Sequence, residues 1–180
     1  MTVELSFVGD IVEVHRTREA LAASRGTAWI EQETALFFET RFVINGVEVF
    51  GLETRSVRTF LVGSDGTPAG VDYHPVSGSL RIPLLNVMAS GRRAFGMALA
   101  TGRGTWSVAG GGTLTFVLLN GQSVKISGTS GTKNIEEVAT VGELRAAFDE
   151  FRRSASEYIA THLTELLDSP GWASAVQAYE

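Results

Sequence analysis

The chain has 180 residues, of which 44% are apolar and 19% are charged, a composition that excludes a disordered or fibrous protein. Cysteine is absent, which excludes a disulfide framework and a thiolate metal site. The N-terminus has no signal-peptide pattern, and no apolar run approaches the roughly 20 residues that a membrane span needs. We therefore expect one soluble, cytoplasmic α+β domain over residues 1–180, with no membrane partner.

In chain order, the first expected elements are a strand over Val3–Val14 and a hairpin whose turn is Asn45-Gly46. Asn-Gly is typical of a two-residue type I′ turn because both of its positions need positive φ. Alternating apolar residues before and after this turn predict one core-facing side of the hairpin, made of Leu36, Phe38, Phe42, Ile44, Val47 and Val49.

The opposite side of this hairpin combines aromatic and acidic residues. We take its members as candidate partner-binding residues: Trp29, Glu31, Glu33, Phe37, Glu39 and Phe50. Aromatic anchors inside a charged rim are typical of protein interfaces, and the acids would steer a basic partner. The alternative is that a helix covers this side and the hairpin is buried between layers.

The middle of the chain predicts a strand over Ser56–Val62, then a loop over residues 63–79 that is rich in Gly, Pro, Asp and Ser. A helix is expected after Pro83, which suits a first helical turn. Further strands are expected at Thr105–Val108 and on both sides of a second Asn-Gly turn at residues 120–121.

The C-terminal part predicts the longest helix. Thr140 and Glu143 match a capping box, and apolar residues then recur at helical spacing for five or more turns. Ser169-Pro170 predicts the start of a short last helix. The expected fold is a largely antiparallel sheet of six to eight strands, with the mid-chain helix and the long C-terminal helix packed on it.

Charge is distributed unevenly along the chain. The stretch from Tyr73 to Ile135 has no acidic residue and six basic ones, whereas the segments before and after it carry net charges of −5 and −6. Such asymmetry indicates either a partner surface or segments that neutralise one another in the fold. Candidate anion-binding residues in this stretch are Arg92, Arg93, Arg103 and Lys133. A pI of about 5.3 and the low density of basic residues argue against nucleic-acid binding.

No motif assigns a catalytic residue, a metal site or a cofactor. The three histidines, His15, His74 and His162, have no neighbours at ligand spacing, and the glycine-rich residues 128–133 lack the spacing of a phosphate-binding loop. The sequence therefore favours a protein that is not an enzyme.

The order of hairpin, mid-chain helix, short strands and long helix, over roughly residues 35–165, resembles the layout of bacterial immunity proteins of polymorphic toxin systems. The resemblance implies a protein-binding inhibitor that neutralises a cognate toxin by covering its active site. The alternative is a small β-barrel-like ligand-binding protein, or an enzyme of the cyclase or isomerase type, with an apolar pocket lined by Phe38, Phe42 and Phe116. A homodimer in which the long helix pairs across the interface is a third hypothesis.

Overall fold

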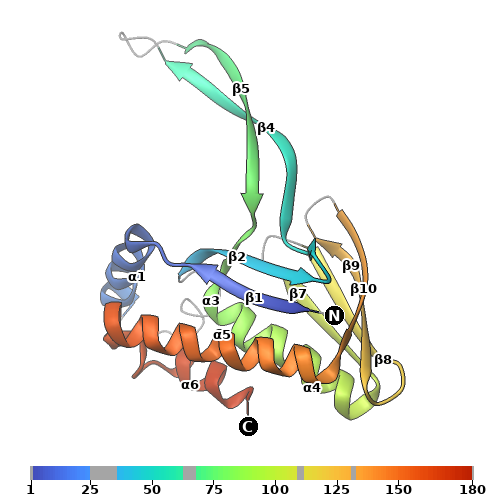
Figure 1. The fold of residues 1–180 in the computed structure, drawn as a ribbon. Coiled ribbons are helices and arrows are strands. Elements are labelled where there is room, and N and C mark those ends of the chain that lie inside the picture. The colour runs from blue at the N-terminus through green and yellow to red at the C-terminus, as the bar shows by residue number, and fades with distance from the viewer. Residues whose placement is uncertain (1, 25–35, 63–67, 109–111, 131–132, 180) are drawn as a thin grey trace.

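A computed structural model describes residues 2–24, 36–62, 68–108, 112–130 and 133–179, and over residues 52–79 it describes the backbone only. Two antiparallel sheets and the helices beside them form the body of the molecule, and a long hairpin projects away from this body (Figure 1). The expected α+β class is confirmed: the body has eight strands in two four-stranded sheets, and the projecting hairpin adds a two-stranded sheet. No helix in the described ranges has the length and apolar content needed to cross a membrane.

The first sheet is built around β2. Its strands are β1 (Val3–Val8), β2 (Phe37–Ile44), β3 (Val47–Glu48) and β6 (Arg81–Pro83). β2 pairs antiparallel with the other three. The first Asn-Gly turn is confirmed, because Asn45 has φ 53° and Gly46 has φ 85°. The predicted core residues of β2 are fully buried, and after the turn Val49 is fully buried as predicted, but Val47 is 41% exposed and its assignment to the core is wrong.

The second sheet has the order β10-β9-β8-β7. Its strands are β7 (Arg103–Val108), β8 (Gly112–Leu118), β9 (Ser123–Ser130) and β10 (Lys133–Thr140). The second Asn-Gly hairpin is confirmed, but its type I′ turn is wrong because only Gly121 of the pair has positive φ. Asn120 instead accepts hydrogen bonds at Oδ1 from the backbone N–H groups of Gln122 and Ser123, at 3.1 and 3.0 Å.

The predicted mid-chain and C-terminal helices are confirmed. The mid-chain helix consists of α3 (Leu84–Asn86), a π-helical turn η1 (Val87–Gly91) and α4 (Arg92–Thr101). The later helices are α5 (Val141–His162), the short 3-10 turn η2 (Thr164–Leu166) and α6 (Pro170–Gln177). α5 begins at the predicted capping box, in which the Glu143 N–H donates to Thr140 Oγ1 at 3.1 Å and the Thr140 N–H donates to the Glu143 carboxylate at 3.2 Å.

The strand expected to continue to Val14 is wrong after Val8. Residues Ile11–Ser24 form helix α1 instead. Asp10 caps this helix, since its Oδ1 accepts from the Val12 N–H at 3.0 Å. The β-branched residues at the start of α1 favour a strand locally, but Val14 and Thr17 are both buried and lie three residues apart, which is a helical spacing.

The loop expected over residues 63–79 is also wrong. Pro68–Ser79 form strand β5, which pairs antiparallel with β4 (Gly51–Val62). We call this pair the β4–β5 arm, and it is the hairpin that extends beyond the body in Figure 1. The pairing has register shifts between Leu52 and Arg55 and between Leu61 and Val62, and such irregularities are where paired strands bend and twist.

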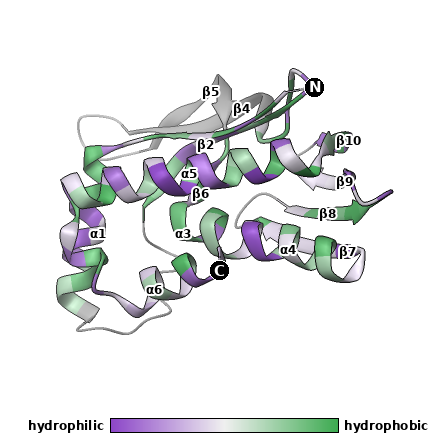
Figure 2. Cartoon of the chain, turned by 60° about the horizontal axis from the view of Figure 1, so that its bottom comes forward, coloured by the Kyte–Doolittle hydropathy of each residue, from purple (hydrophilic) through white to green (hydrophobic). Residues whose placement is uncertain are grey.

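Aromatic side chains hold the layers of the body together. Phe7 and Phe38 of the first sheet each contact Tyr158 of α5, with ring centroids 5.8 and 5.3 Å away. Trp106 of β7 lies 5.4 Å from Phe50, which follows β3, and so joins the two sheets. In Figure 2 hydrophilic and hydrophobic residues alternate in bands along α5, as expected for a helix with one buried side.

Candidate functional site

The predicted partner-binding side of the first hairpin does not form one exposed surface of aromatic and acidic residues. Phe50 is fully buried, where its ring lies 5.6 Å from Phe42, so its assignment to a partner surface is wrong. The physical reason is local: β3 ends at Glu48, the chain turns at residues 49–50, and the two-residue alternation does not survive that turn.

The remaining members of that set are partly covered or outside the described residues. Helix α1 covers part of Phe37, since the Arg16 guanidinium lies 5.7 Å from the centre of its ring. Glu39 is half-buried in the ladder between β1 and β6. Trp29, Glu31 and Glu33 lie outside the described residues.

Two of the four anion-binding candidates line one groove, and two lie elsewhere. Arg93 and Arg103 line the groove described below. Arg92 is half-buried and lies over two aromatic rings, 5.4 Å from the centre of Phe95 and 5.4 Å from that of Tyr179. Lys133 lies at the base of the β4–β5 arm, where its Nζ is 3.0 Å from the position that a Cβ on Gly51 would occupy.

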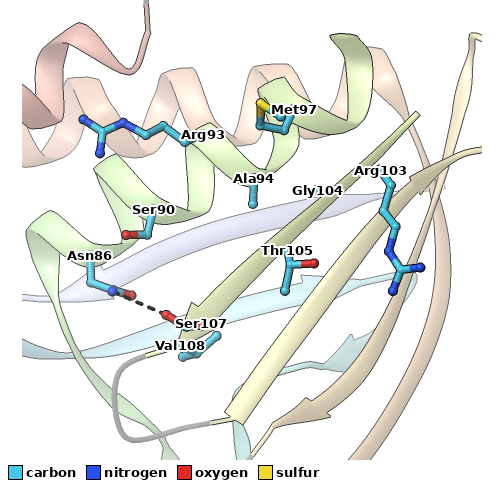
Figure 3. A pocket seen from close by; sticks show the side chains of 10 residues that line it. All are labelled: Asn86, Ser90, Arg93, Ala94, Met97, Arg103, Gly104, Thr105, Ser107 and Val108. Carbon is cyan, nitrogen blue, oxygen red and sulfur yellow. Dashed lines mark hydrogen bonds between the residues drawn. The ribbon is translucent and has the colours of Figure 1, made fainter. Parts of the chain in front are cut away.

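The groove runs between the mid-chain helix and strand β7, and we call it the β7 groove (Figure 3). Its volume is about 840 Å³. The helix contributes a face of residues three or four positions apart, and β7 contributes five of its six residues. The lining residues are Asn86, Ser90, Arg93, Ala94, Met97, Arg103, Gly104, Thr105, Ser107 and Val108.

β7 is the edge of its sheet, and its unpaired side faces this groove. Gly102 O accepts from the Leu118 N–H at 2.9 Å, and the register pairs Arg103 with Val117. Hydrogen-bonded and non-hydrogen-bonded pairs alternate in an antiparallel ladder. The even-numbered residues of β7 therefore bond to β8, and the backbone groups of Arg103, Thr105 and Ser107 point away from it.

Two side chains of the helix contact backbone carbonyls of odd-numbered β7 residues, which confirms that these carbonyls point into the groove, and they close its two ends. Asn86 Nδ2 lies 3.5 Å from Ser107 O, and the Thr101 hydroxyl lies 3.0 Å from Arg103 O. Between these ends, no described strand pairs with the N–H and C=O of Thr105. An edge with unpaired backbone groups is a template for a further strand.

The groove-lining residues of the helix, from Asn86 to Met97, form a shelf beside β7. Gly104 permits the close approach, since a Cβ there would lie 1.8 Å from the backbone oxygen of Ala94. Met97 is 52% exposed on the groove side of the helix. Part of this wall is the π-helical turn η1, a conformation that is frequent at functional sites.

The electrostatics of the β7 groove differ from those of the whole chain. The chain carries a net charge of −5, yet none of the ten lining residues is acidic and two are arginines. Two of the other four basic residues of the acid-free stretch form ion pairs: Arg81 pairs with Asp10 at 2.7 Å and Lys125 with Glu136 at 2.9 Å. In the described part of the chain, Arg93 and Arg103 form no such ion pair.

A second, smaller groove lies along another sheet edge, between β1 and α5, with a volume of about 360 Å³. Helix α5 packs closely against this edge, where the rings of Phe7 and Phe151 are 5.4 Å apart. Its polar lining includes two acids, Glu4 and Glu150. Both acids form ion pairs, Glu4 with Arg41 and Glu150 with Arg153. This groove is smaller than the β7 groove and has no arginine in its lining.

The polar groups near the C-terminal end of α5 form contacts within the protein. The rings of Tyr158 and His162 are 4.5 Å apart, and the carbonyl of His162 accepts from Arg18 at 2.6 Å. Burial raises the pKa of Tyr158, with Asp10 adding to the shift. Among the described residues no group of three or more potential metal ligands is found.

The predictions from sequence missed the β7 groove, although two of its signals were present. The acid-free stretch contains all ten lining residues, and the alternation of polar and apolar residues in Arg103–Val108 is that of a half-exposed strand. Comparison with known proteins adds no assignment: no protein-family model, no curated protein and no solved structure matches the chain.

Proposed function

We propose that this protein is a binding protein that accepts an extended segment of another polypeptide along β7, as a further strand of the second sheet. The observation that carries the proposal is the unpaired edge of β7 facing an open groove beside a helical shelf. Strand addition to a free edge is a recurrent mode of peptide recognition, in which main-chain hydrogen bonds supply affinity and side-chain pockets supply specificity.

The size of β7 fits this mode. Helix side chains occupy the carbonyls of Arg103 and Ser107, so the free part of the edge is centred on Thr105 and spans roughly 13 Å. Each hydrogen bond formed with a partner strand contributes about 1 kcal/mol net. Burial of the exposed Met97 side chain adds about 1 kcal/mol or more, because about half of its surface is open to water. Together these hydrogen bonds and the burial of Met97 predict a moderate affinity, which other contacts with the partner can increase.

The sequence also suggests a protein that binds another protein, but through one side of the first hairpin, whereas this proposal places the binding surface at β7. An immunity-type inhibitor that covers a toxin remains a proposal for the identity of the partner. The ligand-binding alternative gains no support from the rings proposed to line its pocket. Phe38 and Phe42 are fully buried against other rings, and Phe116 lies 6.4 Å from Phe95.

A photo-crosslinking experiment tests the proposal. A benzoylphenylalanine at position 97 is placed on the shelf of the groove, and the protein is irradiated in an extract of its own cells. Thr105→Pro is then added, because it removes an N–H that faces the groove and spares the ladder with β8. We expect a crosslinked polypeptide that is lost with Thr105→Pro and retained with the matched variant Thr105→Val, which keeps the N–H.

The control crosslinker is placed at Leu119, which is 52% exposed in the turn between β8 and β9 and is not part of the groove lining. The proposal fails if position 97 gives no crosslink, if Leu119 gives the same product, or if the product persists with Thr105→Pro. Circular dichroism of each variant establishes that the fold is retained.

A further inference from the structure

We infer that the segment bound in the β7 groove is acidic, and that Arg93 and Arg103 select its carboxylates. This inference rests on the proposed strand addition and specifies the chemistry of the partner. The two arginines come from opposite walls: Figure 3 shows Arg93 extending from α4 and Arg103 from the beginning of β7.

Each arginine is placed to contact a different face of an added strand. The side chains of a strand alternate between its two faces. The inner face of an added strand lies over the helical shelf, where Arg93 is located. The outer face lies beside the exposed side chains of β7, which are Arg103, Thr105 and Ser107. A segment with carboxylates on both faces therefore meets a guanidinium on each.

Arg93 is already held in position by helix α6. Its Nη2 donates to the backbone oxygen of Ser174 at 3.2 Å and lies 2.9 Å from the Ser174 hydroxyl. These contacts occupy one nitrogen of a guanidinium that has five N–H donors, so donors remain for a carboxylate. Because the side chain is ordered before binding, less conformational entropy is lost when a carboxylate binds.

Because the protein as a whole is acidic, a preference for acidic peptides would distinguish the β7 groove from the rest of the surface. A protein with a charge of −5 attracts basic peptides and repels acidic ones through its overall field. A preference for an acidic peptide must therefore come from a local site, and the β7 groove combines two arginines with no lining acid.

The test uses two blocked peptides, TVEVTEVET and its counterpart TVKVTKVKT, titrated into ¹⁵N-labelled protein at low salt. We expect the glutamate peptide to shift the amide resonances of Thr105 and Ser107 and to bind at least about ten times more tightly than the lysine peptide. That preference decreases as salt rises, because exposed charges are screened over about 10 Å at 0.1 M ionic strength.

Charge reversal identifies the residues responsible. Arg93→Glu and Arg103→Glu each weaken binding of the glutamate peptide, and the double variant prefers the lysine peptide. Arg145→Glu, on the exposed side of α5, is the matched control with the same change in net charge, and it leaves the preference unchanged.

The outcomes separate the inference from the proposed function. Equal shifts of Thr105 and Ser107 by both peptides would overturn the selection of acids and leave strand addition standing. Loss of preference in Arg145→Glu to the same extent as in Arg103→Glu would also overturn it. If neither peptide shifts these two amides, strand addition at β7 fails together with the inference.

Discussion

Replacing Trp106 by Phe tests how the two sheets and the mid-chain helix are joined. Trp106 is fully buried, and its Nε1–H donates to Asn86 Oδ1 at 3.0 Å. The phenyl ring retains most of the apolar contact with Phe50 and Phe42 but removes this donor. The variant thus separates the hydrogen bond from most of the packing.

The magnitude follows from two contributions. Loss of its partner leaves the half-buried Asn86 carbonyl unsatisfied, which costs about 1 kcal/mol, the lower end of the range for buried groups. The smaller ring leaves a cavity that costs about 1–2 kcal/mol. We therefore expect Trp106→Phe to lower the free energy of unfolding by about 2–3 kcal/mol, and Trp106→Ala by about 3–5 kcal/mol.

Urea unfolding followed by far-UV circular dichroism measures these changes without relying on the deleted indole. With a slope near 2 kcal/mol per molar urea, Trp106→Phe shifts the midpoint by about 1 M. Asn86→Ala completes a double-mutant cycle, in which we expect a coupling of about 1 kcal/mol with Trp106→Phe. A loss below about 0.5 kcal/mol in Trp106→Phe, or a coupling of zero, would show that this hydrogen bond does not stabilise the fold.

The remaining predictions concern backbone packing, helix capping and a buried hydroxyl. Gly104→Ala places a Cβ 1.8 Å from a backbone oxygen of α4, and we expect it to destabilise the protein by about 3 kcal/mol in thermal unfolding. Gly96→Ala is the matched control, because its nearest contact is at 3.5 Å, and we expect it to stabilise the protein by up to about 1 kcal/mol. Thr140→Ala removes the cap of α5 and costs about 1 kcal/mol in urea unfolding, with Thr140→Ser as the control that keeps the hydroxyl. The hydrogen bonds from the Thr140 hydroxyl and backbone lower the pKa of Glu143. The stability that they contribute is therefore present above the usual carboxyl pKa and is lost as the pH falls through the lowered pKa. In Thr140→Ala we expect stability to decline less steeply on acidification, and a decline as steep as that of the unchanged protein would contradict this. Tyr179→Phe removes a buried hydroxyl that has no hydrogen-bond partner, so its melting temperature is equal to or above that of the unchanged protein, and a loss of more than about 1 kcal/mol would contradict this.

Elements with a strong local signal could be predicted from the sequence. The capping box at Thr140 and the Asn45-Gly46 turn have chemical requirements that few other residues meet, and both are found where they were expected. α1 was missed because its first turn contains Ile11, Val12 and Val14, whose β-branched side chains favour strands. The capping side chain of Asp10 and contacts with the start of β2, where the Phe37 N–H donates to Glu13, favour the helix instead.

The β7 groove could be predicted only in part. Its charge was readable, since Arg93 and Arg103 lie in the acid-free stretch, but the sequence contains no signal for which strand ends a sheet. Edge position depends on the pairing of strands that are distant along the chain. The burial of Phe50 has a distant cause beside the local turn at residues 49–50, because Trp106, 56 residues further along the chain, supplies a ring contact.

Strand addition at β7 is tested by amide hydrogen exchange along this strand, measured by NMR on the free protein and on its complex with the crosslinked partner. In the free protein, the account predicts slow exchange at Gly104, Trp106 and Val108 and fast exchange at Thr105 and Ser107, because only the first set bonds to β8. In the complex, Thr105 and Ser107 become protected as well. Protection of these two amides in the free protein, or their continued fast exchange in the complex, would contradict strand addition at β7.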